Sequence, residues 1–308
     1  MKLSKEQQDQ FETEGYLIVD NALDAADIDQ VIADYSAHID RRAHELFEQG
    51  KISELHEREP FDRRLALVCE ESMEIYPEFD IYKLRAESAF QFLRNENLLD
   101  LVECLVGPEI TCSPIQHLRA KLPSRLTSGA AGHIVPWHQD MGVTLEDADP
   151  YFILTVWLPL TEATIANGCL EILPGTHRGD LVEHVTRAGT GTEILEEALP
   201  EVEPLPLEMS PGSVLLMHKR IPHRSGENST DNVRWSMDLR YQETGLPSGR
   251  PHYPDFVARS RSNPSSELTD YVQWCRLWEE ALAKEAERVE QGTPIIHHRW
   301  KREATQVN

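Results

Sequence analysis

Basic side chains are scarce in this sequence, and their scarcity limits the partners that the chain can bind. Among 308 residues, lysine and arginine number 30 and aspartate and glutamate 53, which gives a formal net charge of −23 at pH 7. A surface of this sign opposes binding to a phosphate backbone or an anionic membrane and favours solubility. We therefore expect neither nucleic acid nor membrane among the partners.

Long apolar runs and regular cysteine spacings are also missing. The start of the chain, from Met1 to Gln8, has no apolar run of signal-peptide length, and no later stretch approaches a membrane span. The five cysteines are scattered without a CxxC spacing, which supports neither a disulfide framework nor a zinc site. These features favour a cytoplasmic protein with reduced thiols.

The composition is otherwise that of a globular protein, with 40% hydrophobic residues. Ser4 with Gln7 predicts a capped helix that Gly15 ends. Asp24 is the predicted N-cap of a long amphipathic helix, because apolar residues follow it at helical spacing. Residues 1–108 are therefore predicted to be mainly helical.

From residue 109 onward, short apolar runs alternate with Pro, Gly, Asn and Asp, the pattern of antiparallel strands joined by turns. The clearest runs are residues 152–158, 169–173, 213–218 and 233–241. Together they predict a mostly β core with flanking helices. We expect this core, over residues 109–242, to be a double-stranded β-helix, the cupin-like jelly roll.

The remaining segments complete a single domain that we expect to span residues 1–308. Residues 192–208 are acidic and contain prolines, which predicts a solvated surface loop between two strands; the alternative is a lid, since long loops over a barrel mouth often have that role. Residues 243–308 are expected to form a loop and then a helix over residues 265–291 that packs outside the β core.

The motif with the most chemical content is His138-Gln139-Asp140. Two imidazoles and one carboxylate on Fe(II) leave three coordination positions open on one side, as an oxygenase requires. Such a triplet alone is weak evidence, because it arises readily by chance in a chain with 13 histidines, and His138 would then be a surface residue. It lies just before a predicted strand, however, where alternation directs His138 and Asp140 to one side and Gln139 away.

A second histidine ligand must come from a distant strand. Four histidines compete for this position: His177, His184, His218 and His223. His218 and His223 would point to opposite faces of one continuous strand, although Pro222 interrupts that simple geometry.

Arg234 favours His223, which it follows by eleven residues. A chelated 2-oxo acid needs a permanently charged fork for its far carboxylate, and an arginine on a neighbouring strand supplies one. Arg234, Ser236, Asp238 and Arg240 alternate with apolar residues and share one face of their strand. If this face points inward, it predicts a ligand-filled interior; if it points outward, it is an ordinary solvated row.

Three motifs, in this order along the chain, resemble the phytanoyl-CoA dioxygenase family, which includes ectoine hydroxylases and natural-product oxygenases. They are Trp137-His138-Gln139-Asp140, the run from Asn167 to Arg178 with its Pro-Gly-Thr-His-Arg turn, and His223-Arg224-Ser225-Gly226-Glu227-Asn228 followed by Arg234. The resemblance covers residues 3–241. It implies a jelly roll that holds Fe(II) and 2-oxoglutarate and uses O2 to oxidise a small-molecule substrate.

The resemblance also implies roles for individual residues. His138, Asp140 and His223 match the iron ligands, and Arg234 matches the clamp for the 2-oxoglutarate carboxylate. Four further residues are similar to positions that line the co-substrate pocket, and could equally belong to the core or the surface: Gln116, Lys121, Trp157 and Ser236. His177 is expected to be structural. Three other histidines are expected near the pocket: His117, His133 and His218.

Asp140 bears on the type of reaction. Related halogenating enzymes have a small residue in its place, so the carboxylate predicts hydroxylation of a C–H bond with release of succinate and CO2. A cluster of basic residues follows the clamp strand: Arg240, Arg250, His252, Arg259 and Arg261. One or two of these are candidates for binding a carboxylate or phosphate of the substrate, and the alternative is pairing with surface Asp and Glu. The net charge disfavours a large polyanion.

Two other function classes remain open at this point. The first is a jelly-roll protein that binds a small molecule without turnover, against which the intact ligand set speaks. The second is a cupin-like metalloenzyme that does not use 2-oxoglutarate and so would not need Arg234.

Overall fold

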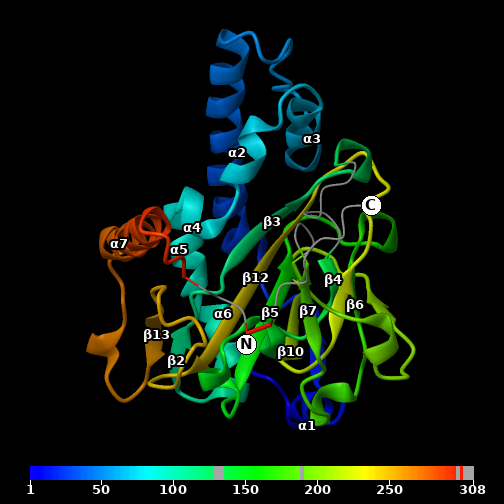
Figure 1. Cartoon of the computed structure of the whole chain (residues 1–308), viewed down its shortest axis with the longest axis vertical. Helices are drawn as coiled ribbons and strands as arrows, with labels where there is room; N and C mark the ends of the chain where they lie inside the picture. Colours follow the sequence, from blue (N-terminus) through cyan, green and yellow to red (C-terminus); the bar gives the residue numbers. More distant parts are fainter. Residues whose placement is uncertain (128–134, 188–190, 296–298, 301–308) are drawn as a thin grey trace.

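The computed structural model describes residues 1–127, 135–187, 191–295 and 299–300 (Figure 1). The first part is mainly helical, as predicted. Its elements are α1 (Lys5–Glu14), β1 (Tyr16–Val19), α2 (Ala25–Glu48), α3 (Phe61–Glu71), α4 (Ile81–Leu84), α5 (Glu87–Leu93) and α6 (Glu96–Val106). Both predicted starts are confirmed, since Ser4 and Gln7 form a capping box at α1 and Asp24 is the N-cap of α2. Gly15 ends α1 with a φ of 77°, a conformation that glycine adopts without strain.

The rest of the described chain is mostly β structure. Its strands are β2 (Glu109–Cys112), β3 (His117–Lys121), β4 (Val135–His138), β5 (Ile153–Pro159), β6 (Leu170–Ile172), β7 (His184–Arg187), β8 (Gly191–Ile194), β9 (Leu205–Leu207), β10 (Val214–His218), β11 (His223–Ser225), β12 (Arg234–Glu243) and β13 (Phe256–Ser260). A seven-stranded sheet has the order β1-β10-β5-β12-β2-β13, and β3 also pairs with β12. A four-stranded sheet has the order β4-β11-β6-β9, and β7 pairs with β8.

The two sheets form the predicted jelly-roll core, and the described strands do not close into one continuous barrel. The segment 192–208 differs from the predicted loop, because it includes part of β8 and all of β9, which pairs with β6. The C-terminal helix α7 (Tyr271–Glu290) begins later than predicted. Its start is fixed by Asp270, whose side chain accepts hydrogen bonds from the first-turn N–H groups of Val272 and Gln273.

Alternation along β12 divides the large sheet into a helical side and an inner side. Trp235, Met237 and Leu239 are fully buried in one apolar cluster with residues of the helices. Trp235 stacks on Phe61 of α3 with 4.6 Å between ring centroids. Burying each large apolar side chain of this kind contributes about 1.5–3 kcal/mol, which fixes the register of β12. The polar residues between them therefore face the other sheet.

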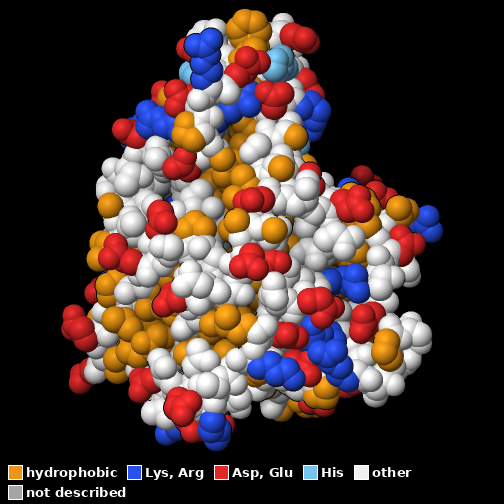
Figure 2. All heavy atoms as spheres, turned by 180° about the vertical axis from the view of Figure 1, so that it is seen from behind, with side chains coloured by type: hydrophobic (Ala, Val, Ile, Leu, Met, Phe, Trp, Pro, Cys, Tyr) orange, Lys and Arg blue, Asp and Glu red, His pale blue; other side chains and the backbone are white. Residues whose placement is uncertain are grey.

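Acidic side chains are scattered over the surface. Figure 2 shows Asp and Glu spread over the whole of one face, among fewer Lys and Arg side chains. No helix in the described ranges combines the length and the apolar character needed to cross a membrane.

Candidate metal and co-substrate site

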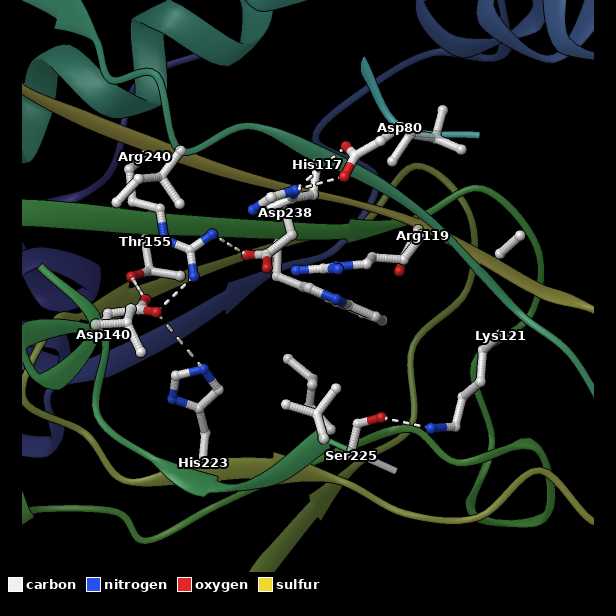
Figure 3. A pocket seen from close by; sticks show the side chains of 18 of the residues that line it. Asp80, His117, Arg119, Lys121, Asp140, Thr155, His223, Ser225, Asp238 and Arg240 are labelled. Carbon is white, nitrogen blue, oxygen red and sulfur yellow. Dashed lines mark hydrogen bonds and ion pairs between the residues drawn. The ribbon is translucent and has the colours of Figure 1, made fainter. Parts of the chain in front are cut away.

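A cavity of about 390 Å³ lies between the two sheets (Figure 3). Two rows of side chains from adjacent strands of the large sheet line it. The row on β3 is His117, Arg119 and Lys121, and the row on β12 is Arg234, Ser236, Asp238 and Arg240. Their register pairs Lys121 with Arg234, Arg119 with Ser236 and His117 with Asp238. The polar face predicted for β12 is thus turned inward.

His138, Asp140 and His223 meet at the opposite wall of this cavity. His138 ends β4 and His223 begins β11, where the two are direct cross-strand partners. Nε2 of each histidine lies 4.0 Å from Oδ1 of Asp140, and the exposed fractions of the three side chains are 12%, 7% and 4% for His138, His223 and Asp140. These ligand atoms all lie within 4.8 Å of one another. The sequence-predicted ligand set is therefore brought together in space.

The donor set fits a divalent transition metal such as Fe(II). Nδ1 of His138 lies 2.9 Å from the carbonyl of Pro136, and Nδ1 of His223 lies 3.0 Å from that of Ile221. Because a carbonyl can only accept, each Nδ1 carries the hydrogen and each Nε2 presents its lone pair to the cavity. Burial and the neighbouring His223 lower the pKa of His138 to about 3, so this ligand stays neutral. Neutral imidazole and carboxylate are the donors of a facial triad.

Asp140 is held in place by two residues of the large sheet. Thr155 on β5 donates a short hydrogen bond to Oδ2, and Arg240 Nη2 donates to Oδ1 at 2.5 Å. Although burial raises the pKa of Asp140, the charge of Arg240 and its hydrogen bond outweigh that effect and keep the pKa well below the usual range. The carboxylate is thus ionised and oriented. Arg240 also pairs with Asp238.

Hydrogen bonds outside the cavity also hold the His138-Gln139-Asp140 segment in place. The strand ends at His138, and Asp140 begins a 3-10 turn, Asp140–Val143. The side chain of Gln139 points away, as predicted, and its Nε2 donates to the carbonyl of Arg220 at 2.7 Å. The backbone N–H of Gln139 donates to Nε2 of His184 at 3.0 Å, which leaves that nitrogen no lone pair for a metal.

The end of the described chain also contacts this turn. Arg299 forms two 2.6 Å contacts with the carboxylate of Asp149 and donates to the carbonyls of Met141 and Thr144. Trp300 donates to the carbonyl of Gly142 at 2.6 Å and stacks on His184 with 5.1 Å between centroids. No local pattern in the sequence indicates these contacts.

The other candidate histidines have different surroundings. His177 packs on Gly15, where a Cβ would lie 2.4 Å from its Nδ1, and contacts the carbonyl of Glu12, which suits the predicted structural role. His218 lies outside the cavity wall and packs against Phe152. His117 lines the cavity, whereas His133 lies outside the described residues.

The far end of the cavity presents cationic side chains. Arg234 is 4% exposed, stacks on Trp157 at 5.2 Å from the ring centroid, and has no hydrogen-bond partner among the described residues for its buried Nε and Nη1. Burial lowers its pKa to about 10, at which it is still charged at neutral pH. Lys121 donates to Ser225 at 2.8 Å, and burial lowers its pKa to about 7. Ser236 is fully buried beside them with an unpartnered hydroxyl, so this end fits a carboxylate.

Gln116 was predicted to line the co-substrate pocket, and the structure places it elsewhere. It is fully buried, is absent from the cavity wall, and donates to the carbonyl of Ser113 at 3.1 Å. It precedes β3 by one position, and the alternation that turns His117 inward turns its neighbour away.

Among the basic residues after the clamp strand, Arg240 and Arg250 line the cavity. Arg259 and Arg261 pair with carboxylates of α6, including Glu103, as the surface-pairing alternative predicts. Gly168, in the second sequence motif, leaves room for the Lys121 side chain, because a Cβ at this position would lie 2.5 Å from Lys121 Cε. Its φ of +74° also favours glycine.

Fold and site together define a jelly-roll protein with a candidate mononuclear metal centre. A model of the phytanoyl-CoA dioxygenase (PhyH) family matches residues 11–236. The chain belongs to this family.

Named relatives agree with this assignment. The peroxisomal phytanoyl-CoA dioxygenase of Bos taurus is 26% identical over 199 residues, which cover 61% of this chain and 54% of that protein. The human protein is 28% identical over 188 residues, which cover 58% and 52%. The chain spans about half the length of the curated relatives it matches.

Solved structures share the fold. The apo form of the non-heme monooxygenase ThoJ superposes with a TM-score of 0.62 at 21% identity, covering 92% of this chain and 97% of that one. EctD from S. alaskensis with 2-oxoglutarate and 5-hydroxyectoine gives a TM-score of 0.53 at 20% identity, with coverages of 79% and 77%. At these identities the likeness shows a common fold.

Proposed function

We propose that this protein is an Fe(II)- and 2-oxoglutarate-dependent dioxygenase that hydroxylates a small-molecule metabolite at an unactivated C–H bond. Overall, one oxygen atom of O2 enters the substrate and the other enters succinate, as 2-oxoglutarate loses CO2. One observation supports the proposal most directly: the Nε2 atoms of His138 and His223 and the carboxylate of Asp140 converge in the same cavity as Arg234, a buried guanidinium without a carboxylate partner among the described residues. Membership of the PhyH family supports it.

Fe(II) and 2-oxoglutarate, when bound, would supply the oxidising chemistry, and the chain's residues would position them. His138, Asp140 and His223 would hold the metal, with Thr155 and the Arg240 side chain keeping the carboxylate oriented. The Arg234 fork would bind the far carboxylate of 2-oxoglutarate.

The surroundings of that fork support the second assignment. Lys121 and Ser236 lie beside Arg234, and the Trp157 ring covers one face of the guanidinium. These buried walls exclude water and strengthen the ionic contact. The carboxylate at position 140 supports hydroxylation over halogenation.

The test is an anaerobic visible spectrum of protein loaded with Fe(II) and then 2-oxoglutarate. A weak charge-transfer band is expected in the native protein. His138→Ala should abolish it and Arg234→Ala should weaken it, while His218→Gln, which replaces a half-buried histidine outside the cavity wall, serves as the matched control. Succinate release then reports turnover.

The same experiment separates the two alternatives. Iron-loaded protein without a band points away from 2-oxoglutarate chelation, and activity that survives Arg234→Ala without 2-oxoglutarate points to a different cupin-like metalloenzyme. A band without succinate release on any substrate points to a binding protein.

We also propose that residues 1–308 form a single domain, with parts 1–108, 109–242 and 243–308. The apolar cluster that runs from Leu3 through the large sheet to Trp278 supports this. The five cysteines are all free thiols in the structure, which supports a cytoplasmic location.

A further inference from the structure

The cavity collects positive charge in a chain that is strongly acidic. Six Lys and Arg side chains line it, against three Asp side chains, whereas the whole chain has a formal charge of −23. The acidic ones are Asp80, Asp140 and Asp238, and the basic ones are Lys83, Arg119, Lys121, Arg234, Arg240 and Arg250. A concave site with low-dielectric walls focuses such a field and draws in anions.

Most of these charges have a partner or an assigned role. Arg240 pairs with two of the three carboxylates, and the third, Asp80, accepts from His117 at 2.9 Å. Arg234 and Lys121 occupy the end proposed for 2-oxoglutarate. Lys83 and Arg119 are exposed, so that water can solvate them.

Arg250 is different because it is only partly exposed, unlike Lys83 and Arg119, and has no carboxylate partner among the described residues. Its Nη2 donates to the carbonyl of Val143 at 2.6 Å. Its Nε is shielded from solvent and makes no hydrogen bond within the described chain. Burial lowers its pKa to about 10, so it stays charged at neutral pH. A cation that is partly removed from water and lacks a counter-ion is unfavourable unless a ligand supplies the negative charge.

The backbone holds Arg250 next to the metal-ligand turn. Val143, its hydrogen-bond acceptor, is the last residue of the turn that begins at Asp140. The loop before it is fixed, since the carbonyl of Gly249 accepts from Leu145 N–H and a Cβ at Gly249 would lie 2.6 Å from Thr144 Cβ. An anion bound to Arg250 would therefore lie beside the three metal ligands and not at the far clamp.

We propose that Arg250 binds a carboxylate of the substrate, so that the substrate of this enzyme is a small organic acid. A single arginine fork matches one carboxylate bidentately, whereas a phosphate dianion calls for further cations. The cavity of about 390 Å³ must also hold the co-substrate, which limits the acid to a small one. This inference rests on the proposed function.

The test uses the anaerobic Fe(II)–2-oxoglutarate complex, in which Arg234 is already occupied. Linear and cyclic carboxylic acids, and the primary amide of each, are titrated while the charge-transfer band is followed. At least one acid should shift the band where its amide does not. Arg250→Gln should weaken binding of that acid by about tenfold or more, since a charge-assisted fork is lost.

Two further variants serve as controls. Arg250→Lys keeps the charge but not the fork, and should bind the acid with intermediate affinity. Arg94→Gln removes another arginine with an unpartnered buried Nε, outside the cavity wall, and should bind the acid as the native protein does.

The outcomes separate this inference from the function beneath it. If the native protein forms no band, the proposed function fails and the substrate class fails with it. If the band forms but no acid is preferred over its amide, or if Arg250→Gln and Arg250→Lys both bind the acid with native affinity, only the substrate class is overturned. Circular dichroism spectra establish that each variant is folded.

Discussion

Binding of 2-oxoglutarate should be accompanied by uptake of nearly one proton at pH 8 and of none at pH 6. The group that takes up the proton is the side-chain amine of Lys121. Burial, with a smaller contribution from the charge of Arg234, lowers the pKa of Lys121 from 10.5 to about 7, and Glu227 opposes the shift. At 1.36 kcal/mol for each pKa unit, keeping this ammonium charged in the free protein costs on the order of 5 kcal/mol relative to water. A carboxylate beside it removes much of that cost and raises the pKa.

The sign of the pH dependence follows from these values. Below pH 7 the free protein already has the proton on Lys121, so binding takes up none. At pH 8 only about one free molecule in ten is protonated there, and the complex must acquire the proton. Above pH 7 the affinity for 2-oxoglutarate should therefore fall by about tenfold per pH unit until the pKa in the complex is reached.

Anaerobic calorimetry of the Fe(II)-loaded protein, in buffers of different ionisation enthalpy, measures this proton uptake directly. Lys121→Met and Lys121→Arg should both abolish it, the first by removing the group and the second by keeping a permanent charge. Native protein that takes up no proton at pH 8, or Lys121→Met that takes up as much as native, would refute the placement of the co-substrate carboxylate beside this lysine.

Three further changes test other parts of the site. Thr155→Val removes the donor to Asp140 Oδ2 at nearly constant volume, and should weaken Fe(II) binding by roughly 10–100-fold in a competition titration with a chelator; native affinity would contradict this supporting role. Gly142→Ala puts a Cβ 2.5 Å from the ring of His184, and should lower the free energy of unfolding by about 1–3 kcal/mol in urea, with an unchanged midpoint as the contrary result. Burial lowers the pKa of His218 to about 3, so below pH 6.5 its unfolded form gains a proton that the folded form rejects. Stability should then fall by about 1.4 kcal/mol per pH unit for this residue, and urea unfolding of His218→Gln should show a shallower fall between pH 6.5 and 4.

Local patterns in the sequence were enough for the helix starts and for the shared polar face of β12, but not for the direction in which that face points. A capping box involves residues three positions apart, and alternation along a strand needs only that strand. The choice among four histidines was harder, because His218 and His223 lie in different sheets and not on one continuous strand. Arg234 was the informative residue there. A buried arginine fork implies a bound 2-oxo acid, and His223, which precedes Arg234 by eleven residues, is the histidine that fits a metal ligand beside it.

The other residues of the site could not be placed from local patterns, because their positions depend on contacts between segments that are distant in the sequence. Gln116 and His117 differ by one position, and only the pairing of β3 with β12 determines which of them faces the cavity. Thr155 lies within an apolar run, so nothing local marks it as the partner of Asp140. Arg240 was considered for a substrate anion, yet it pairs with Asp140 across 100 positions of the chain.

The contacts of Arg299 and Trp300 with the turn after Asp140 have a consequence for biosynthesis. Met141 and Arg299 are 158 positions apart, which a ribosome takes on the order of ten seconds to translate. Before Arg299 and Trp300 are synthesised, His138, Asp140 and His223 can already be present and even folded. The turn that begins at Asp140 then still lacks its hydrogen bonds from these two residues. Stable iron loading is therefore expected only after Arg299 and Trp300 have been synthesised, and a protease that cuts between α7 and Arg299 would return the folded protein to that earlier state.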